Sequence, residues 1–284
     1  MKKGVGEILL AGILSVVLAS TCLAGENVEP GNLPINGEVG EQAGRHGEWD
    51  IKLGAGMMVG PRYEGSDKYV VYPLPSVSVT WRDIISLGTD GLNVNVWRGS
   101  NYRLGAGLTY NPGRREDGAD FFGTDLYGAD DSLRGLGDID AALGIRAFGS
   151  YMLGPVSFRA SITKFTGEQN DGLLLNLGLS LPLHPTNRLT LAPGVGITWA
   201  DDNYMETFFG VSPQQSARSG YPVFNAGAGV KDVTVGLNAT YSLNRHWFVM
   251  TNAGAKLLLD DAERSPITHE SASLVFSTVI GYHF

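Results

Sequence analysis

From Trp49 to the C-terminus, apolar and polar residues alternate along the chain with a period of two. Over residues 175–183 every second residue is leucine, and Asn, Gly, Ser and Pro stand between them. Successive side chains of a strand point to opposite faces, so the pattern predicts β-strands with one apolar face and not helices. The same pattern recurs in residues 49–59, 77–81, 102–110, 156–162 and 189–199.

A soluble β-sandwich would alternate in the same way, but three features favour a membrane barrel. The predicted strands have about ten residues, as a tilted membrane strand needs, whereas soluble strands have about five or six. The chain ends in apolar residues of one parity, with Tyr282 and the terminal Phe284, which resembles the C-terminal assembly signal of bacterial outer-membrane barrels. Aromatic residues gather at the segment ends, where an interfacial girdle lies: Trp49, Trp81, Tyr102, Tyr110, Tyr151, Trp199, Tyr241, Trp247 and Tyr282. We therefore expect an all-β fold, a transmembrane antiparallel up-and-down β-barrel.

The connections set the number of strands, because a bacterial single-chain barrel has an even number and both ends on the periplasmic side. A hairpin is expected at Asp90-Gly91, a pair favoured in such turns. Long connections are expected on the outer side, chiefly residues 111–137 and 201–231. Periplasmic turns are expected at residues 82–83, 153–155, 184–187 and 242–246. This arrangement predicts about 12 strands, with about 10 or 14 as the alternatives.

The N-terminal segment has the features of a signal peptide. Lys2 and Lys3 precede an apolar stretch over residues 8–18, and small residues lead to Ala24, so we expect residues 1–24 to be removed. Lipidation of Cys22 is the alternative. Residues 25–48 are rich in Gly, Asn, Glu and Pro and predict a flexible periplasmic leader, which leaves residues 49–284 for the barrel.

Composition narrows the classes of function. The net charge of −8 argues against a nucleic-acid partner. A single cysteine allows no intrachain disulfide and leaves a Cys/His zinc finger with too few ligands. After residue 24 no run approaches the roughly 18 consecutive apolar residues of a membrane helix. We expect no cofactor.

Charged residues of both signs fall on the inward parity. They indicate either a selective pore or ion site, or an interior whose charges neutralise one another, as a narrow barrel favours. Asp138 and Asp140 share one face, but without further oxygen ligands we expect no metal site. The predicted lumen charges are Asp50, Lys52, Arg103, Asp138, Asp140, Arg146, Arg159 and Lys256.

Glycines such as Gly54, Gly105 and Gly144 also fall on the inward parity, where they leave space or permit strand curvature. One hypothesis is that the aromatic loop over residues 204–209 folds into that space as a plug; the alternative is that the glycines serve curvature alone. Among the histidines only His269, beside Glu270 and Ser271, suggests an acyl-hydrolase triad, and strand neighbours point to opposite faces. Phosphate-loop, HExxH and GxSxG motifs are absent from the sequence, so we expect no enzymatic activity.

Several loop motifs carry more information than the strands. They are PRYEGSDKY (61–69), PLP (73–75), GR (113–114), GLGDID (135–140), WADDNYM (199–205), FGVSP (209–213) and SPIT (265–268). In this order they resemble the MipA/OmpV outer-membrane family over essentially all of residues 49–284.

The resemblance implies an integral protein of the Gram-negative outer membrane without known catalytic activity. It further implies a scaffold that links a membrane-bound lytic transglycosylase to a bifunctional penicillin-binding protein in murein (peptidoglycan) synthesis. Other members are linked to osmotic response or adhesion, and a porin-like or gated small-solute channel is a further alternative. Expected partners of the barrel also include outer-membrane lipid, lipopolysaccharide and the barrel assembly machinery.

The residues expected to form functional or plug loops come from two of these motif regions. The competing interpretation is that they hold the outer loops together through turns and capped amides. They are Pro61, Tyr63, Glu64, Gly65, Ser66, Asp201, Asp202, Tyr204, Met205, Phe208, Phe209 and Gly210.

Overall fold

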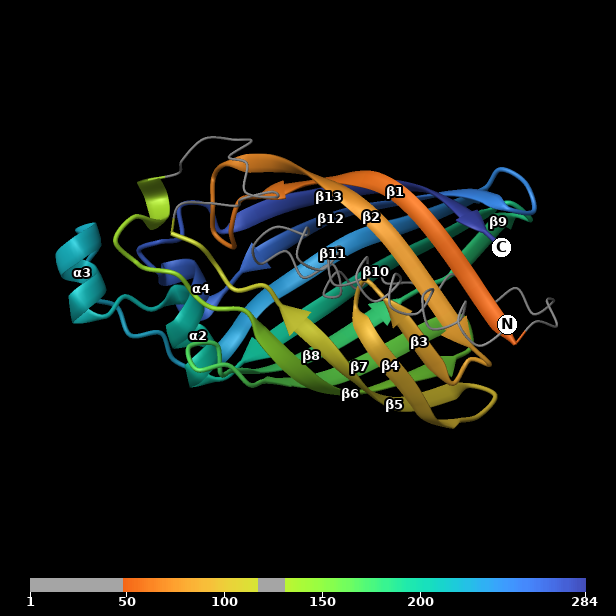
Figure 1. The fold of residues 1–284 in the computed structure, drawn as a ribbon, viewed down its shortest axis with the longest axis horizontal. Coiled ribbons are helices and arrows are strands. Elements are labelled where there is room, and N and C mark those ends of the chain that lie inside the picture. Colours follow the sequence, from red (N-terminus) through yellow and green to blue (C-terminus); the bar gives the residue numbers. More distant parts are fainter. Residues whose placement is uncertain (1–47, 117–130) are drawn as a thin grey trace, which may run out of the picture.

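The computed structural model describes residues 48–116 and 131–284, so the predicted signal peptide and residues 25–47 of the predicted leader lie outside the described residues. One antiparallel sheet closes on itself, because β10 (Leu189–Ala200) pairs with β11 (Gly229–Ser242) as well as with β8 (Leu173–Ser180). Figure 1 shows the elongated barrel that results. Its other strands are β1 (Trp49–Pro61), β2 (Tyr69–Trp81), β3 (Ile85–Gly88), β4 (Gly91–Arg98), β5 (Tyr102–Asn111), β6 (Ala142–Leu153), β7 (Val156–Phe165), β9 (Leu183–Thr186), β12 (Trp247–Leu258) and β13 (Ala272–His283).

The wall has 12 strand positions, which confirms the predicted number. β8 and β9 share one position, because both pair with β10 on the same side. The predicted hairpin at Asp90-Gly91 joins β3 to β4, and Gly91 adopts a φ of 103° there. The turn predicted at residues 184–187 lies later in the chain: residues 183–186 form β9, and the chain turns at Asn187-Arg188.

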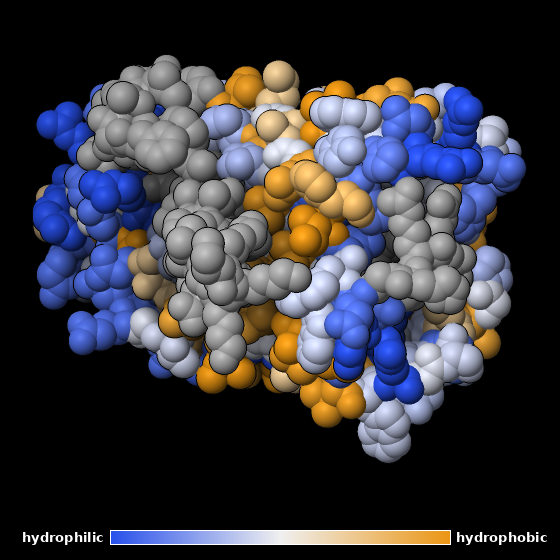
Figure 2. All heavy atoms as spheres, turned by 45° about the vertical axis from the view of Figure 1, so that its right-hand side comes forward, coloured by the Kyte–Doolittle hydropathy of each residue, from blue (hydrophilic) through white to orange (hydrophobic). Residues whose placement is uncertain are grey.

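The outward face of the wall is apolar, as the alternation predicted. In β8, Leu175, Leu177 and Leu179 are 38%, 48% and 41% exposed, while Asn176 and Gly178 alternate with them. Figure 2 shows hydrophobic residues gathered over the middle of the molecule and hydrophilic residues at both ends. This distribution is typical of a barrel whose central band contacts lipid.

The two ends of the barrel differ. At one end the strands are joined by tight turns, and β1 begins and β13 ends there; we call it the periplasmic end, following the rule for such barrels. At the other, outer end the connections are longer, and their described residues carry four short helices. These are η1 (Asp131–Leu133), α2 (Asp202–Phe209), α3 (Pro213–Ser219) and α4 (Asp260–Arg264). None of the helices in residues 48–116 and 131–284 is long and apolar enough to cross a bilayer.

Aromatic residues meet in pairs at the periplasmic end. The rings of Trp49 and Trp81 lie 6.3 Å apart on neighbouring strands. Tyr282 contacts Trp247 at 5.1 Å and Phe284 at 4.9 Å, both edge to face. The residues proposed as a C-terminal assembly signal therefore take part in the aromatic ring of this end.

The lumen has two unlike sides. Residues from β1, β2 and β13 form a buried apolar cluster, which we call the lumen apolar cluster: Met58, Val70, Tyr72, Leu74, Val275 and Val279. On the opposite side, β8, β10, β11 and β12 present buried or half-buried polar side chains, among them Asn176, Thr198, Thr234, Asn238 and Asn252.

Candidate functional site: the outer cap and its buried charge cluster

Four of the connections at the outer end of the barrel pack together. We call residues 62–68, 131–141, 201–228 and 259–271 the outer cap. Two hydrophobic cores hold it together. One combines cap residues with residues at strand ends: Ile139, Ala142, Phe165, Leu174, Ala200, Tyr204, Met205, Phe208, Phe209, Ala226, Leu258 and Ala262. The other joins all four connections: Tyr63, Leu133, Leu136, Val211 and Ile267.

Helix α2 is the largest apolar contributor to the cap. Asp201 caps its N-terminus, since its carboxylate accepts from the backbone N–H of Tyr204 at 2.9 Å, which satisfies one of the free donors of the first turn. The same carboxylate accepts from the N–H of Leu173 at 2.9 Å. At the C-terminus of the helix, the carbonyl of Phe208 accepts from Arg114 at 2.8 Å and that of Phe209 from the Ser265 hydroxyl at 2.6 Å. These bonds satisfy carbonyls that a helix end leaves without intrahelical partners, so the helix is fixed to the barrel rim at both ends.

The connection between β1 and β2 docks against the segment that precedes β13. The carbonyl of Gly65 accepts from the N–H groups of His269 at 2.7 Å and Glu270 at 3.0 Å, and the Tyr63 hydroxyl donates to the carbonyl of Ile267 at 3.2 Å. Gly65 has a φ of 95°, and a Cβ there would lie 2.8 Å from the Thr268 hydroxyl. Only glycine fits this position without strain.

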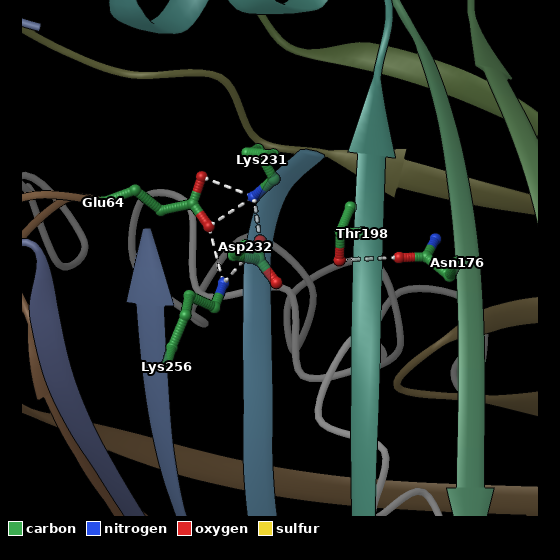
Figure 3. A network of polar contacts seen from close by, with 6 residues as sticks. All are labelled: Glu64, Asn176, Thr198, Lys231, Asp232 and Lys256. Carbon is green, nitrogen blue, oxygen red and sulfur yellow. Dashed lines mark hydrogen bonds and ion pairs between the residues drawn. The ribbon is translucent and has the colours of Figure 1, made fainter. Parts of the chain in front are cut away.

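A buried charge cluster lies beneath this connection. Lys231 Nζ is 2.7 and 2.9 Å from the two carboxylate oxygens of Glu64 and 2.8 Å from Asp232 Oδ2. Lys256 Nζ lies 2.6 Å from Glu64 and 3.9 Å from Asp232. Figure 3 shows the four side chains converging from the loop and from β11 and β12. Two positive and two negative charges make the cluster neutral.

A β-bulge makes this convergence possible. Lys231 and Asp232 are consecutive, and consecutive residues of a regular strand point to opposite faces. The register between β10 and β11 shifts here, because Asp232 pairs with Thr198 whereas Val230 pairs with Trp199. Lys231 is the extra residue of the bulge, so both side chains reach the buried cluster.

Burial and charge act in opposite directions on Glu64. Burial alone would raise the pKa of its carboxyl, but the positive charges of Lys231 and Lys256 outweigh burial, and the pKa lies below its ordinary value. Lys231 also lies 5.6 Å from the ring centroid of Tyr204, within the range of a cation–π contact. The cluster therefore joins the β1–β2 connection, two strands and α2 in one ionised unit.

The structure brings most of the predicted loop residues together in the cap. Glu64 from one motif meets Lys256, one of the predicted lumen charges, and Asp202 accepts from the N–H of Ala228 at 2.6 Å. Gly210 donates its N–H to the carbonyl of Glu206 at 3.0 Å, and Ser66 donates its N–H to the carbonyl of Tyr63 at 3.0 Å. The functional role of these residues remains a prediction.

The aromatic loop lies at the outer end of the strands and not among the lumen glycines named in the plug hypothesis. A Cβ on Gly105 would lie 2.4 Å from the ring of Phe148, and one on Gly144 would lie 2.8 Å from the ring of Phe165. Aromatic side chains of neighbouring strands therefore occupy the space at both glycines. We describe α2 as part of a cap for this reason.

Several predicted lumen charges do lie on strands of the barrel. Lys52 pairs with Asp50 at 3.1 Å, and His283 Nε2 lies 3.1 Å from Asp50. Arg146 contacts Asp90 at 3.0 Å and Asn93 at 2.7 Å. Arg103 and Arg159 pair with the same residue of β6, Ser150, from either side.

The prediction that Asp138 and Asp140 face the lumen is wrong. Both precede β6 and are exposed in the outer cap, because the strand begins only at Ala142. Asp138 accepts from the N–H of Glu116 at 2.8 Å. In the described part of the chain, no group of three His, Cys, Asp or Glu side chains is placed to hold a metal ion.

Lys231, Asp232 and Arg114 are the site residues that sequence reasoning missed. Lys231 falls in a stretch expected to be an outer loop, and the alternation places Asp232 on the opposite face from its neighbour. A β-bulge cannot be recognised from the alternation of apolar and polar residues. The sequence signal that could have indicated these two residues is a pair of opposite charges, Lys231 and Asp232, at the start of a predicted strand.

The closed sheet with its apolar belt, aromatic ring and capped outer end defines an integral outer-membrane β-barrel protein. The chain belongs to the family described as MltA-interacting protein MipA, whose pattern matches residues 53–284.

Relatives in two species support this membership. The MltA-interacting protein of Escherichia coli (strain K12) is 27% identical over 249 residues, which cover 84% of this chain and 92% of that protein, and the protein of the same name from Shigella flexneri gives the same values. Among solved structures, the translocator domain of the autotransporter NalP from Neisseria meningitidis aligns with a TM-score of 0.40 and 11% identity over 85% of this chain and 90% of that one. OmpT of Vibrio cholerae aligns with a TM-score of 0.39 and 8% identity over 83% and 97%.

Proposed function

We propose that this barrel is a non-enzymatic scaffold of the outer membrane that binds a lytic transglycosylase of the murein synthesis machinery at its periplasmic end. The observation that carries the proposal is the outer cap: all four of its connections share one hydrophobic core, three of them share a second, and a neutral buried charge cluster ties Glu64 to β11 and β12. A barrel built to pass solutes needs an open path there, whereas a scaffold does not. Membership of a family described by interaction with MltA supports the same function.

The surroundings of His269 support the absence of an enzymatic activity. Its Nε2 lies 3.0 Å from the hydroxyl of Tyr221, and its Nδ1 lies 3.8 Å from Asp67. Both partners belong to the outer cap, and the Tyr221 hydroxyl also contacts the carbonyl of Ser132 at 3.0 Å. This histidine therefore connects loops, in place of the acyl-hydrolase arrangement considered for it.

The periplasmic surface that we assign to the partner is the turn between β11 and β12. A cleft of about 390 Å³ lies there, lined by Asn244, Arg245, His246, Trp247 and Tyr282. The imidazole of His246 stacks on Tyr282 at 5.4 Å with an interplanar angle of 11°. Aromatic and arginine side chains are those most enriched in the centres of protein interfaces.

Binding to an immobilised lytic transglycosylase tests the proposal, with residues 25–284 reconstituted in lipid nanodiscs. We expect wild type to bind, and the double variant Arg245→Ala/His246→Ala to bind at least about tenfold more weakly, a loss of about 1.4 kcal/mol. Arg188→Ala, in the neighbouring exposed turn, is the matched control and should bind as wild type. Absence of binding by wild type, together with ion conductance in planar bilayers, would replace the scaffold with a channel.

A further inference from the structure

In the described part of the chain, the β3–β4 hairpin joins β2 to β5 for only part of their length. β3 has four residues, and its ladder with β2 comprises only Val79, Thr80 and Trp81. β4 pairs with β5 only as far as Leu108. Figure 1 shows the β3–β4 hairpin stopping short of the outer ends of the strands that flank it, β2 and β5. Above the Asp90-Gly91 turn, therefore, no described strand joins β2 to β5.

The sequence of β2 is typical of a strand whose backbone has no neighbouring strand on one side. Arg62 donates its N–H to Lys68 at 2.9 Å, and Arg82 donates its N–H to Glu48 at 2.8 Å, while the register of β1 with β2 is continuous between these bonds. The even-numbered residues of β2 thus bond to β1, and the odd-numbered ones direct their backbone groups to the other side. Pro73 and Pro75 are odd-numbered, so the two missing N–H donors fall on the open side.

This placement has a physical reason. An unpaired N–H at membrane depth costs several kcal/mol, and proline has none. The prolines also prevent another strand from adding to this edge, because it would find no donors at two successive positions. A protein partner that pairs as a strand is therefore a poor occupant of the opening.

The opening lies at the depth of the lipid acyl chains. A strand rises about 3.3 Å per residue, and with a tilt of about 40° each residue gains about 2.5 Å of height. Positions 73–77 thus lie about 10 to 20 Å above Trp81 of the periplasmic aromatic ring, from the middle into the outer half of a hydrophobic belt about 25 Å tall. Val71 on β2 and Leu108 on β5, which are 40% and 48% exposed, place apolar side chains on the outward surface beside it.

Behind the opening, β2 turns apolar side chains to the lumen. Val70, Tyr72 and Leu74 belong to the lumen apolar cluster and alternate along β2 with Val71, Pro73 and Pro75. At the lower edge, Arg146 of β6 reaches past Gly107 of β5 to the carbonyl and carboxylate of Asp90, at 3.3 and 3.0 Å, and fixes the hairpin turn. We propose that this lateral opening admits an acyl chain of an outer-leaflet lipid, which inserts between β2 and β5 toward the lumen apolar cluster.

Contact with the acyl chains of the bilayer can be measured by quenching. Residues 25–284 contain no cysteine, so a single Cys can carry a bimane label, and lipids brominated on their acyl chains quench it only at short range. Ser76→Cys places the label on the lumen side of β2 beside the opening. Ser161→Cys is the matched control, since Ser161 also faces the lumen at half-buried exposure but pairs on both sides, with Phe148 and Asn176. Ala160→Cys, on the outward face, gives the full effect of lipid contact.

We expect the label at position 76 to be quenched at least half as strongly as that at 160, and the label at 161 to be quenched hardly at all. Equal quenching at 76 and 161 would overturn the proposal, as would quenching at 76 by aqueous iodide but not by bromolipid. Bromolipid quenching that appears only after deletion of residues 25–47 would assign the opening to that segment instead. Heat-modifiable migration in gels confirms that each variant is folded before it is compared.

Discussion

Replacement of Lys231 by methionine tests whether the buried charge cluster holds the outer cap on the barrel. The substitution keeps a side chain of similar length but leaves Glu64 and Asp232 with one positive partner, Lys256, which lies 2.6 Å from the first and 3.9 Å from the second. Lys231 is 1% exposed, so water has little access to the uncompensated charge. Removal of one partner from a buried ion pair costs about 3–5 kcal/mol, which is a factor of about 10² to 10⁴ in the equilibrium for opening of the cap.

Hydrogen exchange of the backbone amides of α2 measures that opening directly. In the wild type the N–H of Met205 donates to the carbonyl of Asp201 at 3.0 Å, and its exchange requires the helix to open. We expect exchange in α2 to accelerate by about 10² to 10⁴ in Lys231→Met, while the amides of β6 and β7 keep their rates. The effect should be local because the ion pairs of the cluster join the cap to β11 and β12, which are far from β6 and β7 in the strand order.

Two further variants separate charge balance from packing. In Glu64→Gln/Lys231→Met one charge of each sign remains, on Asp232 and Lys256, so part of the protection should return. Lys164→Met removes an exposed ion pair with Asp171 and should change α2 exchange by less than about 1 kcal/mol. Unchanged α2 exchange in Lys231→Met would refute the reasoning and leave the two hydrophobic cores as the forces that hold the cap.

Three other predictions concern the cap. Gly65→Ala should raise the rate of protease cleavage in residues 201–228 by more than Gly220→Ala does. Both glycines have a positive φ, so each change costs about 1 kcal/mol or more in backbone strain. Of the two, only Gly65 would also place its Cβ in close contact, with Thr268. The pKa of Glu64 lies below its ordinary value of 4.5, so its contribution to cap stability is fully present above pH 4.5 and is lost as the pH falls through the lower pKa of the folded state. Hydrogen exchange in α2, corrected for its intrinsic pH dependence, should therefore accelerate only as the pH falls below the ordinary value of this carboxyl. Deletion of residues 203–213 should convert a wild type with little single-channel conductance into a conducting barrel; a wild type that already conducts like a general porin would contradict a closed outer end.

The fold was accessible from the sequence because strand alternation is a local property. The position of a residue in the alternation shows which face of its strand the side chain lies on. The apolar face of every segment contacts lipid, whichever strands are its neighbours. The Asp90-Gly91 hairpin was predictable for the same reason, since glycine tolerates the positive φ that this turn requires. The break at residues 181–182 and the later turn at Asn187-Arg188 depend on pairing with β10, which local pattern does not report.

Only part of the candidate site could be predicted from the sequence. The loop motifs around Glu64 and Tyr204 indicated where the candidate site lies. The ion-pair partner of Glu64, however, is Lys231, 167 positions later in the chain. That contact depends on which strands flank each other after closure of the barrel. Asp138 and Asp140 show the converse error, because their alternating positions look like a strand, although β6 begins only at Ala142 and Ile139 between them forms no more than an isolated bridge with Arg114.

By itself, the sequence determined the class of this protein, its membrane setting, a strand number of about 12 with about 10 or 14 as the alternatives, and its family, since each of these follows from local periodicity, end residues or contiguous motifs. Tertiary structure decided the rest: that Lys231 and Asp232 share one face through a bulge, that α2 packs on buried residues at the outer ends of β7, β8, β10 and β12, and that Pro73 and Pro75 border an opening. The physical reason is that side-chain direction at a bulge, and the presence or absence of a neighbouring strand, are fixed by hydrogen-bond pairing between distant segments and leave no trace in the order of residues along one of them.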